Sequence, residues 1–338
     1  MMDFNLELLV IYPLATLILT IIFVKFFITL AHKYNLKSIP HQGGVRKDIV
    51  PTSGGISFGI VYLTMIILFK YFHHIPDQYF LSIVFGAGMM LLIGFFDDIY
   101  SLSSLARLFT QFIFVTFILW IFGAHNYSFG NPILMMPIYF FGLTWIINTF
   151  NFIDGADGLV SVNSAFFSLV GGVFCFLNKD YSLASCLWML TSINIGFLFF
   201  NWSPAKVFMG DSGSLMIGSI YSIFILGAIS SGINSVWTWL ILLSVFFVET
   251  TVTLIFRLSR RENVFTSHHS LHAYQQIIIK TGKHNRPAIF SIIINLLWTI
   301  PMSVLSYIYP GLGFYITVIT CLPLAFLFYF NGPYLEKN

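Results

Sequence analysis

Residues 8–31 read LLVIYPLATLILTIIFVKFFITLA, an apolar run in which Lys25 is the one charged side chain. About 20 such residues let a helix cross the hydrocarbon core of a bilayer. We count eleven such runs, at residues 8–31, 55–70, 79–96, 106–123, 133–150, 159–177, 183–200, 213–229, 236–256, 288–309 and 311–330. Their apolar residues do not alternate with polar ones as in barrel strands, so the sequence predicts an all-α polytopic integral membrane protein.

Composition supports one transmembrane domain over residues 1–338. Hydrophobic residues make up 57% of the chain and charged residues 9%, whereas soluble domains carry about 25% charged residues. The loops are too short for a separate soluble domain. Because the chain is so apolar, we expect membrane lipid to be a partner. A net charge of +3 gives no reason to expect nucleic acid as a partner. The three cysteines lie in apolar runs and indicate neither disulfides nor zinc. We expect the first run to be a retained helix, because no small-residue cleavage site follows it.

The loops on the two sides of the membrane differ in positive charge. Of the 16 Lys and Arg residues, thirteen fall in the odd-numbered loops and the C-terminal tail, and two, Lys70 and Lys179, fall on the other side. Cytoplasmic loops are enriched in Lys and Arg. We therefore expect the odd-numbered loops to face the cytoplasm. They also carry the polar motifs, within residues 31–54, 97–107, 148–158, 201–214 and 257–287.

Asp97 and Asp98 end an apolar run with two adjacent carboxylates. Two anions at a membrane interface repel each other and lose hydration unless a cation or a proton joins them. A hard divalent metal that bridges phosphate oxygens is one solution, and a solvated helix end is the alternative. Arg107 begins the next run, where it can pair with a diphosphate or anchor the helix.

Two longer polar stretches follow. NTFNFIDGADGL at residues 148–159 contains Asn151, Asp154 and Asp157 around two Asp–Gly steps, which break a helix because glycine adopts positive φ angles readily. NWSPAKVFMGDSGS at residues 201–214 places Asp211 at the start of a helix, where backbone N–H groups and the helix dipole favour an anion. Asp211 can hold a metal that binds the same anion, so these residues indicate a phosphate-plus-metal site.

The ninth loop combines three arginines with HHSLHAYQ at residues 268–275. His269 and His272 are three residues apart and would share a face of a helix, a spacing that suits zinc or phosphate. A zinc site needs a third protein ligand, and no cysteine is available. We therefore expect His269 and His272 to recognise an anion, with solvated histidines as the alternative.

These motifs, in this order, resemble the polyprenyl-phosphate N-acetylhexosamine-1-phosphate transferases, which are of the glycosyltransferase family 4 type. The resemblance spans residues of about 40 to 285. It implies a bacterial inner-membrane enzyme that transfers a sugar 1-phosphate from a UDP-sugar to undecaprenyl phosphate and releases UMP. The implied cofactor is Mg²⁺, with Mn²⁺ as an alternative ion. A monomer and a homodimer both stay open.

The resemblance also implies a role for each motif residue. Asp211 matches the residue that holds magnesium, and Phe208 matches an aromatic residue beside the uracil. Asp97 and Asp98 match an acidic pair at the polyprenyl phosphate, and with Asp154 they are the expected catalytic residues. The expected substrate-binding residues are Arg107, Asn151, Asp157, Phe208, His269 and His272.

Two departures concern the donor sugar. Members that use GlcNAc have a third Asp where this chain has Ser101, and their adjacent histidines are replaced here by His269-x-x-His272. That form is similar to members that initiate O-antigen synthesis with 6-deoxy sugars such as FucNAc or QuiNAc. The run of three histidines typical of the pentapeptide-donor branch is absent. The resemblance therefore implies a step in lipopolysaccharide or other envelope polysaccharide synthesis and leaves the sugar open.

The expected chemistry is direct attack of the acceptor phosphate on the donor β-phosphorus, with Asp97 taking or positioning any proton. A covalent route with Asp97 or Asp154 as the nucleophile is the alternative. A polytopic transporter is the rival class, but transporters tend to place charges near the bilayer midplane and to contain repeats. Here Glu249 is the one clear mid-helix acid, and we find no repeat. The Asp-Gly-x-x-Ala-Arg pattern of the CDP-alcohol phosphotransferases is missing.

Overall fold

The computed structural model describes residues 7–34, 50–73, 75–123, 132–231, 235–261 and 272–332. These residues form helices joined by short connections. In chain order the helices are η1 (Glu7–Ile11), α1 (Tyr12–Lys33), α2 (Gly55–Phe72), α3 (Asp77–Leu81), η2 (Ser82–Ala87), α4 (Gly88–Tyr100), α5 (Ser104–Ile121), α6 (Pro132–Ile153), α7 (Leu159–Leu177), α8 (Tyr181–Asn201), α9 (Gly210–Ser231), α10 (Val236–Leu242), α11 (Ser244–Ser259), α12 (Ala273–Thr281), α13 (Arg286–Ile294), η4 (Asn295–Thr299), α14 (Ile300–Ile308), η5 (Pro310–Leu312) and α15 (Gly313–Asn331).

The membrane-spanning helices agree with the apolar runs. Ten described helices are long and apolar enough to cross a bilayer, and a bent pair of helices makes up to eleven. Short π-helical segments interrupt two of these spans without breaking them, at η2 before α4 and at η4 between α13 and α14. The prediction of an all-α polytopic membrane protein is confirmed, and most span boundaries lie within a few residues of the predicted ones.

Helix α9 lies at the centre of the bundle. Of its most apolar 18-residue stretch, 94% is buried, compared with 28% for α1 and α5 and 22% for α15. Small residues let neighbouring helices approach α9 closely, because lipid-embedded helices associate by close packing. A Cβ on Gly218 would lie 2.9 Å from the Cα of Ile147 in α6. Helices α9 and α6 therefore pack closely at this point.

Buried polar side chains join the C-terminal helices to the bundle. Asn163 in α7 donates to the hydroxyl of Ser291 at 2.8 Å and accepts from Asn295 Nδ2 at 2.7 Å. Thr299 Oγ1 donates to Asn295 Oδ1 at 2.9 Å. In a membrane such bonds stabilise one arrangement of the helices, because polar groups need partners there.

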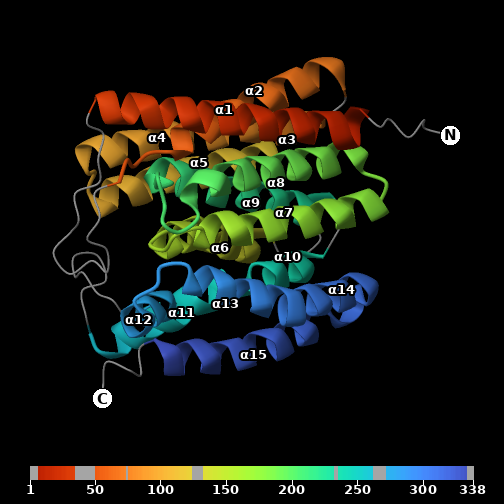
Figure 1. Ribbon diagram of the computed structural model, residues 1–338. Coiled ribbons are helices and arrows are strands. Elements are labelled where there is room, and N and C mark those ends of the chain that lie inside the picture. The colour runs from red at the N-terminus through yellow and green to blue at the C-terminus, as the bar shows by residue number, and fades with distance from the viewer. Residues whose placement is uncertain are drawn as a thin grey trace.

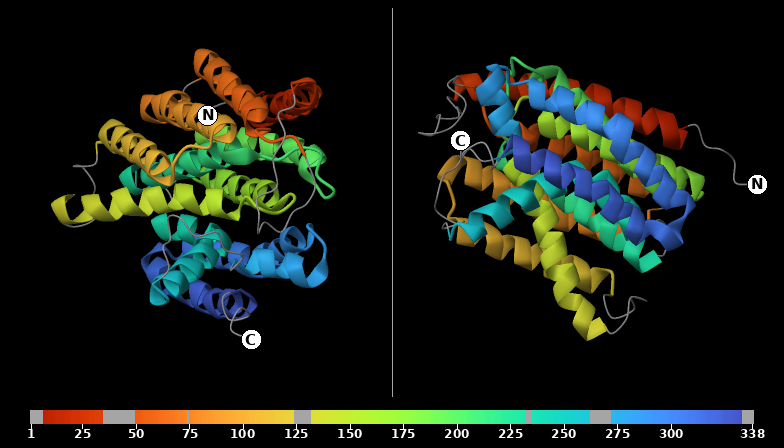
Figure 2. Two further views of the ribbon diagram at one scale, coloured as in Figure 1. Left: turned by 90° about the vertical axis from the view of Figure 1, so that its left-hand side faces the viewer. Right: turned by 90° about the horizontal axis from the view of Figure 1, so that it is seen from below.

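One span is bent. Helices α10 and α11 meet at Leu243 with an angle of 76° between them, although the sequence has neither Gly nor Pro at the bend. Figure 1 shows α12 at the same end of the bundle as the α4–α5, α6–α7 and α8–α9 connections. Figure 2 shows α6 running obliquely across its neighbours. The motif-bearing connections therefore share one end, as the odd-numbered loops were expected to.

Candidate active site

Asp97 lies in the last turn of α4, and its side chain binds the backbone that follows the helix. Its Oδ1 accepts a hydrogen bond from the N–H of Leu102 at 2.7 Å, and its Oδ2 lies 3.3 Å from Nη1 of Arg107. The residue is 6% exposed. The two aspartates end the α4 helix as the sequence predicts, and Arg107 lies in the first turns of α5.

Asp98 has a different environment from Asp97. Its two carboxylate oxygens accept the N–H groups of Asp211 at 2.8 Å and Ser212 at 3.2 Å. Gly210 precedes them with φ +71°, and a Cβ there would lie 2.6 Å from Asp98 Oδ2. The start of α9 does hold an anion, the Asp98 side chain, which engages these two N–H groups. A substrate phosphate near the start of α9 stays a prediction.

Asp211, in α9, is contacted by side chains from two other helices, α5 and α6. Its Oδ2 accepts from Arg107 Nη1 at 3.1 Å, and its Oδ1 accepts from Asn151 Nδ2 at 2.7 Å. The same Arg107 nitrogen contacts Asp97. The structure thus brings Asp97, Arg107, Asn151 and Asp211 together from α4, α5, α6 and α9. The side chains of Arg107 and Asp211 are about 30% exposed (30% and 29%), so this cluster faces outward from the bundle.

A pair of amides outside the predicted set supports this cluster. Gln111 Nε2 donates to Asn148 Oδ1 at 3.2 Å, and Asn148 Nδ2 donates to Gln111 Oε1 at 2.6 Å. Gln111 lies one helical turn beyond Arg107, and Asn148 lies one turn before Asn151. The pair therefore fixes α5 against α6 next to the cluster. Their helical spacing from Arg107 and Asn151 is the signal that could have identified them.

The connection from α6 to α7 contains Asp154 and Asp157. The helix ends at Ile153 and resumes at Leu159, and Gly158 has a φ of +70°, as the Asp–Gly steps predict. Asp154 is half-buried. Asp157 is 1% exposed and accepts the N–H of Ala205 at 3.3 Å. Asp157 therefore holds the α8–α9 connection.

Phe208 belongs to a short pairing between two connections. Its N–H donates to Pro51 O at 2.8 Å, and its carbonyl accepts the N–H of Gly54 at 2.8 Å. The N–H of Gly55 continues the pairing to Met209 O at 2.9 Å. The Phe208 side chain is half-buried, close in sequence to Asp211 at the start of α9.

His272 is the last predicted site residue that the structure describes, because His269 lies outside the described residues. His272 is buried and precedes α12, which begins at Ala273. It therefore lies at the N-cap of α12 and not within the helix, where a spacing of three residues would place two side chains on one face. Its backbone N–H donates to Gln275 Oε1 at 3.2 Å, and its ring stacks on Tyr274 with centroids 5.5 Å apart.

The donor set of the cluster is suited to magnesium. Among the described residues no three His, Cys, Asp or Glu side chains lie close enough to hold a metal alone. Mg²⁺ in phosphate-handling sites takes one or two carboxylates and completes its shell with water and phosphate oxygens. Asp97 and Asp211 provide two carboxylates against one guanidinium, so a further cation is favourable there. The residues of this cluster therefore fit Mg²⁺.

Comparison with known proteins finds a family and several relatives. Residues 80–229 match the family described as Glycosyl transferase family 4, a range that contains every predicted site residue except His269 and His272. The phospho-N-acetylmuramoyl-pentapeptide-transferase of Streptococcus sanguinis strain SK36 is 27% identical over 277 residues, covering 75% of this chain and 83% of the relative. The enzyme of the same name from Prochlorococcus marinus subsp. pastoris is 29% identical over 280 residues, covering 75% of this chain and 76% of the relative.

Proposed function

Because this chain belongs to glycosyl transferase family 4 and is a polyprenyl-phosphate sugar-1-phosphate transferase, we propose that it transfers an N-acetylhexosamine 1-phosphate from a UDP-sugar to undecaprenyl phosphate. The observation that carries this proposal is the convergence of Asp97 and Asp211 on one nitrogen of Arg107. Two carboxylates and a guanidinium at the shared end of α4, α5 and α9 suit a reaction between two phosphorylated substrates.

Each residue of the cluster has a separate role in the proposal. Asp211 holds Mg²⁺, and Asn151 orients the Asp211 carboxylate through its hydrogen bond to Oδ1. Bound Mg²⁺ neutralises charge on the donor diphosphate and the leaving UMP. Arg107, which bonds to the other oxygen of the Asp211 carboxylate, balances part of the negative charge of the phosphates. Asp98 keeps the start of α9 in place through the N–H groups of Asp211 and Ser212.

The proposed reaction is a direct displacement. An oxygen of the acceptor phosphate attacks the β-phosphorus of the donor, the bond from that phosphorus to the bridging oxygen breaks, and UMP leaves with the electron pair. Asp97 takes or positions any proton on the acceptor. Its carboxylate oxygens already contact the N–H of Leu102 and Arg107. This engagement favours direct attack over a covalent route through Asp97, while Asp154 stays the alternative nucleophile.

We propose a donor without a peptide. The relatives are named for phospho-N-acetylmuramoyl-pentapeptide, but this chain has Ser270 and Leu271 between His269 and His272 instead of a run of three histidines. UDP-GlcNAc and UDP-linked 6-deoxy sugars such as FucNAc or QuiNAc are the candidates. Asp154, Asp157, Phe208, His269 and His272 are the proposed donor-binding set, in which Asp157 acts through the backbone of Ala205.

The proposed setting is the bacterial inner membrane, with the active site facing the cytoplasm. The chain is a multi-pass membrane protein, and its relatives from Streptococcus and Prochlorococcus are bacterial. The excess of Lys and Arg in the odd-numbered loops supports this orientation. UDP-sugars are made in the cytoplasm, and the acceptor chain stays in the hydrocarbon, so the two substrates meet at this interface. The product would serve the synthesis of O-antigen or another envelope polysaccharide.

The decisive experiment is a measurement of UMP release. Purified protein is incubated with undecaprenyl phosphate, Mg²⁺ and a panel of UDP-sugars, with and without EDTA. Asp211→Asn should lower the rate by orders of magnitude, as loss of a group that stabilises transferring phosphates does. Asp77→Asn is the matched control, since Asp77 begins the α4 span at its opposite end and pairs with Lys70.

Three outcomes would contradict the proposal in distinct ways. Full activity in EDTA would exclude the role of the metal. Release of UMP from the pentapeptide donor alone would exclude the donor class. Uptake of solute by vesicles without any UMP release would favour the transporter.

A further inference from the structure

Glu249 is a buried carboxylate that faces the start of α12. It lies in α11, is 4% exposed, and its Oε1 accepts the N–H of Tyr274 at 2.9 Å. The N–H of Ala273 also interacts with this carboxylate. A buried carboxylate is costly unless it is hydrogen-bonded, and first-turn N–H groups of a helix need acceptors. Each therefore satisfies the other, and α11 fixes where α12 begins.

The Tyr274 side chain continues from α12 to the α6–α7 connection. Its hydroxyl donates to Phe152 O at 3.2 Å, directly before Ile153 and Asp154. Gly155 makes room for this contact, since a Cβ on Gly155 would collide with the Tyr274 hydroxyl. Burial raises the pKa of Tyr274 well above its usual value, so the phenol stays protonated and remains a donor.

The same turn of α12 carries His272. Its ring stacks on the Tyr274 ring, and it lies immediately before Ala273. One buried acid therefore fixes both the donor-loop residue His272 and the backbone beside Asp154. We call Glu249, Tyr274, Phe152 and Gly155 the α12 anchor.

We propose that Glu249 is a positioning residue for donor recognition, which acts through the α12 anchor to align His272 with Asp154. The inference rests on the proposed function, in which these two residues contact the UDP-sugar. Glu249 itself touches neither substrate. Its loss should therefore weaken donor binding more than it slows transfer, and it should leave acceptor binding unchanged.

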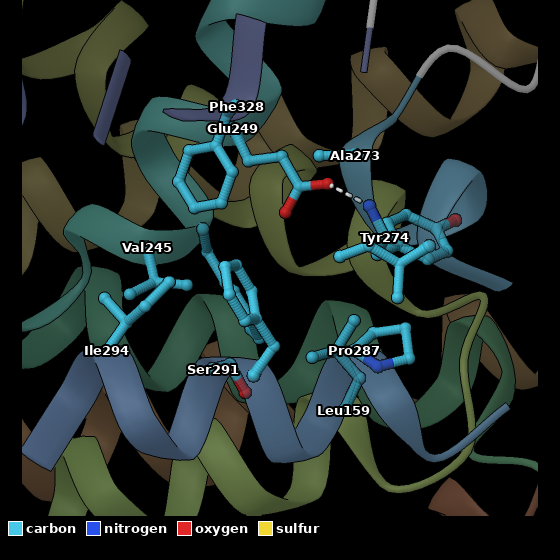
Figure 3. A pocket seen from close by; sticks show the side chains of 12 residues that line it. Leu159, Val245, Glu249, Ala273, Tyr274, Pro287, Ser291, Ile294 and Phe328 are labelled. Carbon is cyan, nitrogen blue, oxygen red and sulfur yellow. Dashed lines mark hydrogen bonds between the residues drawn. The ribbon is translucent and has the colours of Figure 1, made fainter. Parts of the chain in front are cut away.

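A small cavity beside Glu249 allows a clean substitution. Its volume is about 20 Å³, and it is lined mostly by apolar side chains, including Val245, Ile294 and Phe328. Figure 3 shows Glu249 at its edge with the bond to the Tyr274 nitrogen. A cavity of this size has room for about one water molecule. An unbranched Met can fill the place of Glu249 and part of this space, so Glu249→Met removes the acceptor with little change in volume.

The kinetic test compares four variants with the wild type. Glu249→Met should raise the KM for the donor about tenfold, the effect of losing a hydrogen bond to a charged group, and should leave the KM for undecaprenyl phosphate within about twofold. Glu249→Gln keeps an acceptor and should recover most of the affinity. Tyr274→Phe should reproduce part of the defect. Asn295→Ala is the control, because it removes buried bonds to Asn163 and Thr299 in the same group of helices.

Hydrogen exchange gives a readout that needs no activity. Glu249→Met should speed exchange in peptides covering residues 272–281 and 150–158, whereas Asn295→Ala should affect residues 286–308. Absence of UMP release by the wild type would refute the proposed function, and the exchange would still test the anchor. The inference is overturned if Glu249→Met leaves exchange at residues 150–158 unchanged, or if its kinetics match those of Asn295→Ala.

Discussion

The carboxylate of Asp98 holds the backbone of Asp211, although 113 residues separate them: it accepts the N–H of Asp211 at 2.8 Å and that of Ser212 at 3.2 Å. Asp98 thus caps α9 from another helix, while its neighbour Asp97 contacts Arg107. The two adjacent acids therefore have separate functions: Asp98 holds the backbone at the start of α9, and Asp97 belongs to the charged cluster.

Replacement of Asp98 should distinguish a cap from a group that contacts substrate. Asn keeps one acceptor oxygen for one of the two N–H groups but presents an NH₂ to the other, whereas Ala keeps no acceptor and costs about 0.5–2 kcal/mol as a cap. We expect Asp98→Asn to retain part of the thermal stability and part of the activity, and Asp98→Ala to lose more of both. Unfolding in detergent and UMP release are the measurements. A stable but fully inactive Asp98→Asn protein would mean that the carboxylate acts on substrate directly.

Arg107 should be sensitive to conservative replacement. A Lys ammonium can contact Asp97 and Asp211 as Nη1 of Arg107 does, but it lacks the second guanidinium nitrogen, which contacts Ser104 Oγ at 3.5 Å, and the planar set of donors that suits phosphate. We expect Arg107→Lys to lower kcat roughly 100-fold, as the loss of a donor to a charged transition state does. Arg107→Gln should be partly rescued by a higher concentration of Mg²⁺, because a cation is then missing between the two carboxylates. The dependence of kcat on Mg²⁺ checks both, and an unchanged dependence for Arg107→Gln would count against a shared charge cluster.

The ninth loop should set the choice of donor. Ser270 and Leu271 lie outside the described residues, next to the N-cap of α12. Replacing both with His should change the ratio of turnover between UDP-GlcNAc and UDP-linked 6-deoxy sugars. Competition between the two donors measures that ratio directly. If the ratio stays constant, the discriminating contacts lie elsewhere, with residues 31–54 as the next candidates.

The orientation of the chain can be tested with a single thiol. Ser267 lies in the ninth loop, outside the described residues. In a variant with Cys175, Cys186 and Cys321 replaced by Ala, Ser267→Cys should react with a membrane-impermeant reagent in inverted vesicles and stay protected in intact cells. Transfer of the acceptor chain out of the hydrocarbon costs about 0.8 kcal/mol per CH₂, so its phosphate must be met at this interface. Labelling in intact cells would reverse the topology and separate the site from cytoplasmic UDP-sugars.

The sequence predicts the membrane spans well because lipid imposes a single requirement, a long helical run of apolar residues. The bend at Leu243 could not be predicted in this way. It has no Pro or Gly, and its 76° angle depends on how α10 and α11 pack against different neighbours. Local pattern therefore determines which residues cross the membrane, whereas tertiary contacts determine how straight the span is.

In the candidate site, too, local pattern predicts some features and tertiary contacts determine the others. Motif composition identifies Asp97, Arg107, Asn151 and Asp211, which the structure brings together. It does not distinguish an acid that faces the cluster from one that binds backbone N–H groups, such as Asp98 or Asp157, because that distinction depends on residues far away in the chain. Glu249 is a stronger case, since a lone acid in an apolar helix gives no indication of the Tyr274 N–H that it accepts.

The bonds from Asn163 to Ser291 and Asn295 have a consequence for biogenesis. Spans enter the membrane in the order of their synthesis, so α7 is inserted more than a hundred residues before η4, which carries Asn295. Until then Asn163 Nδ2 keeps its bond to Leu159 O within α7, but Asn163 Oδ1 lacks its partner in a medium where an unpaired polar group costs several kcal/mol. Docking of the C-terminal helices should therefore be a distinct late step in assembly, and a chain truncated before Arg286 should expose a polar defect within the bilayer that quality-control proteases can recognise.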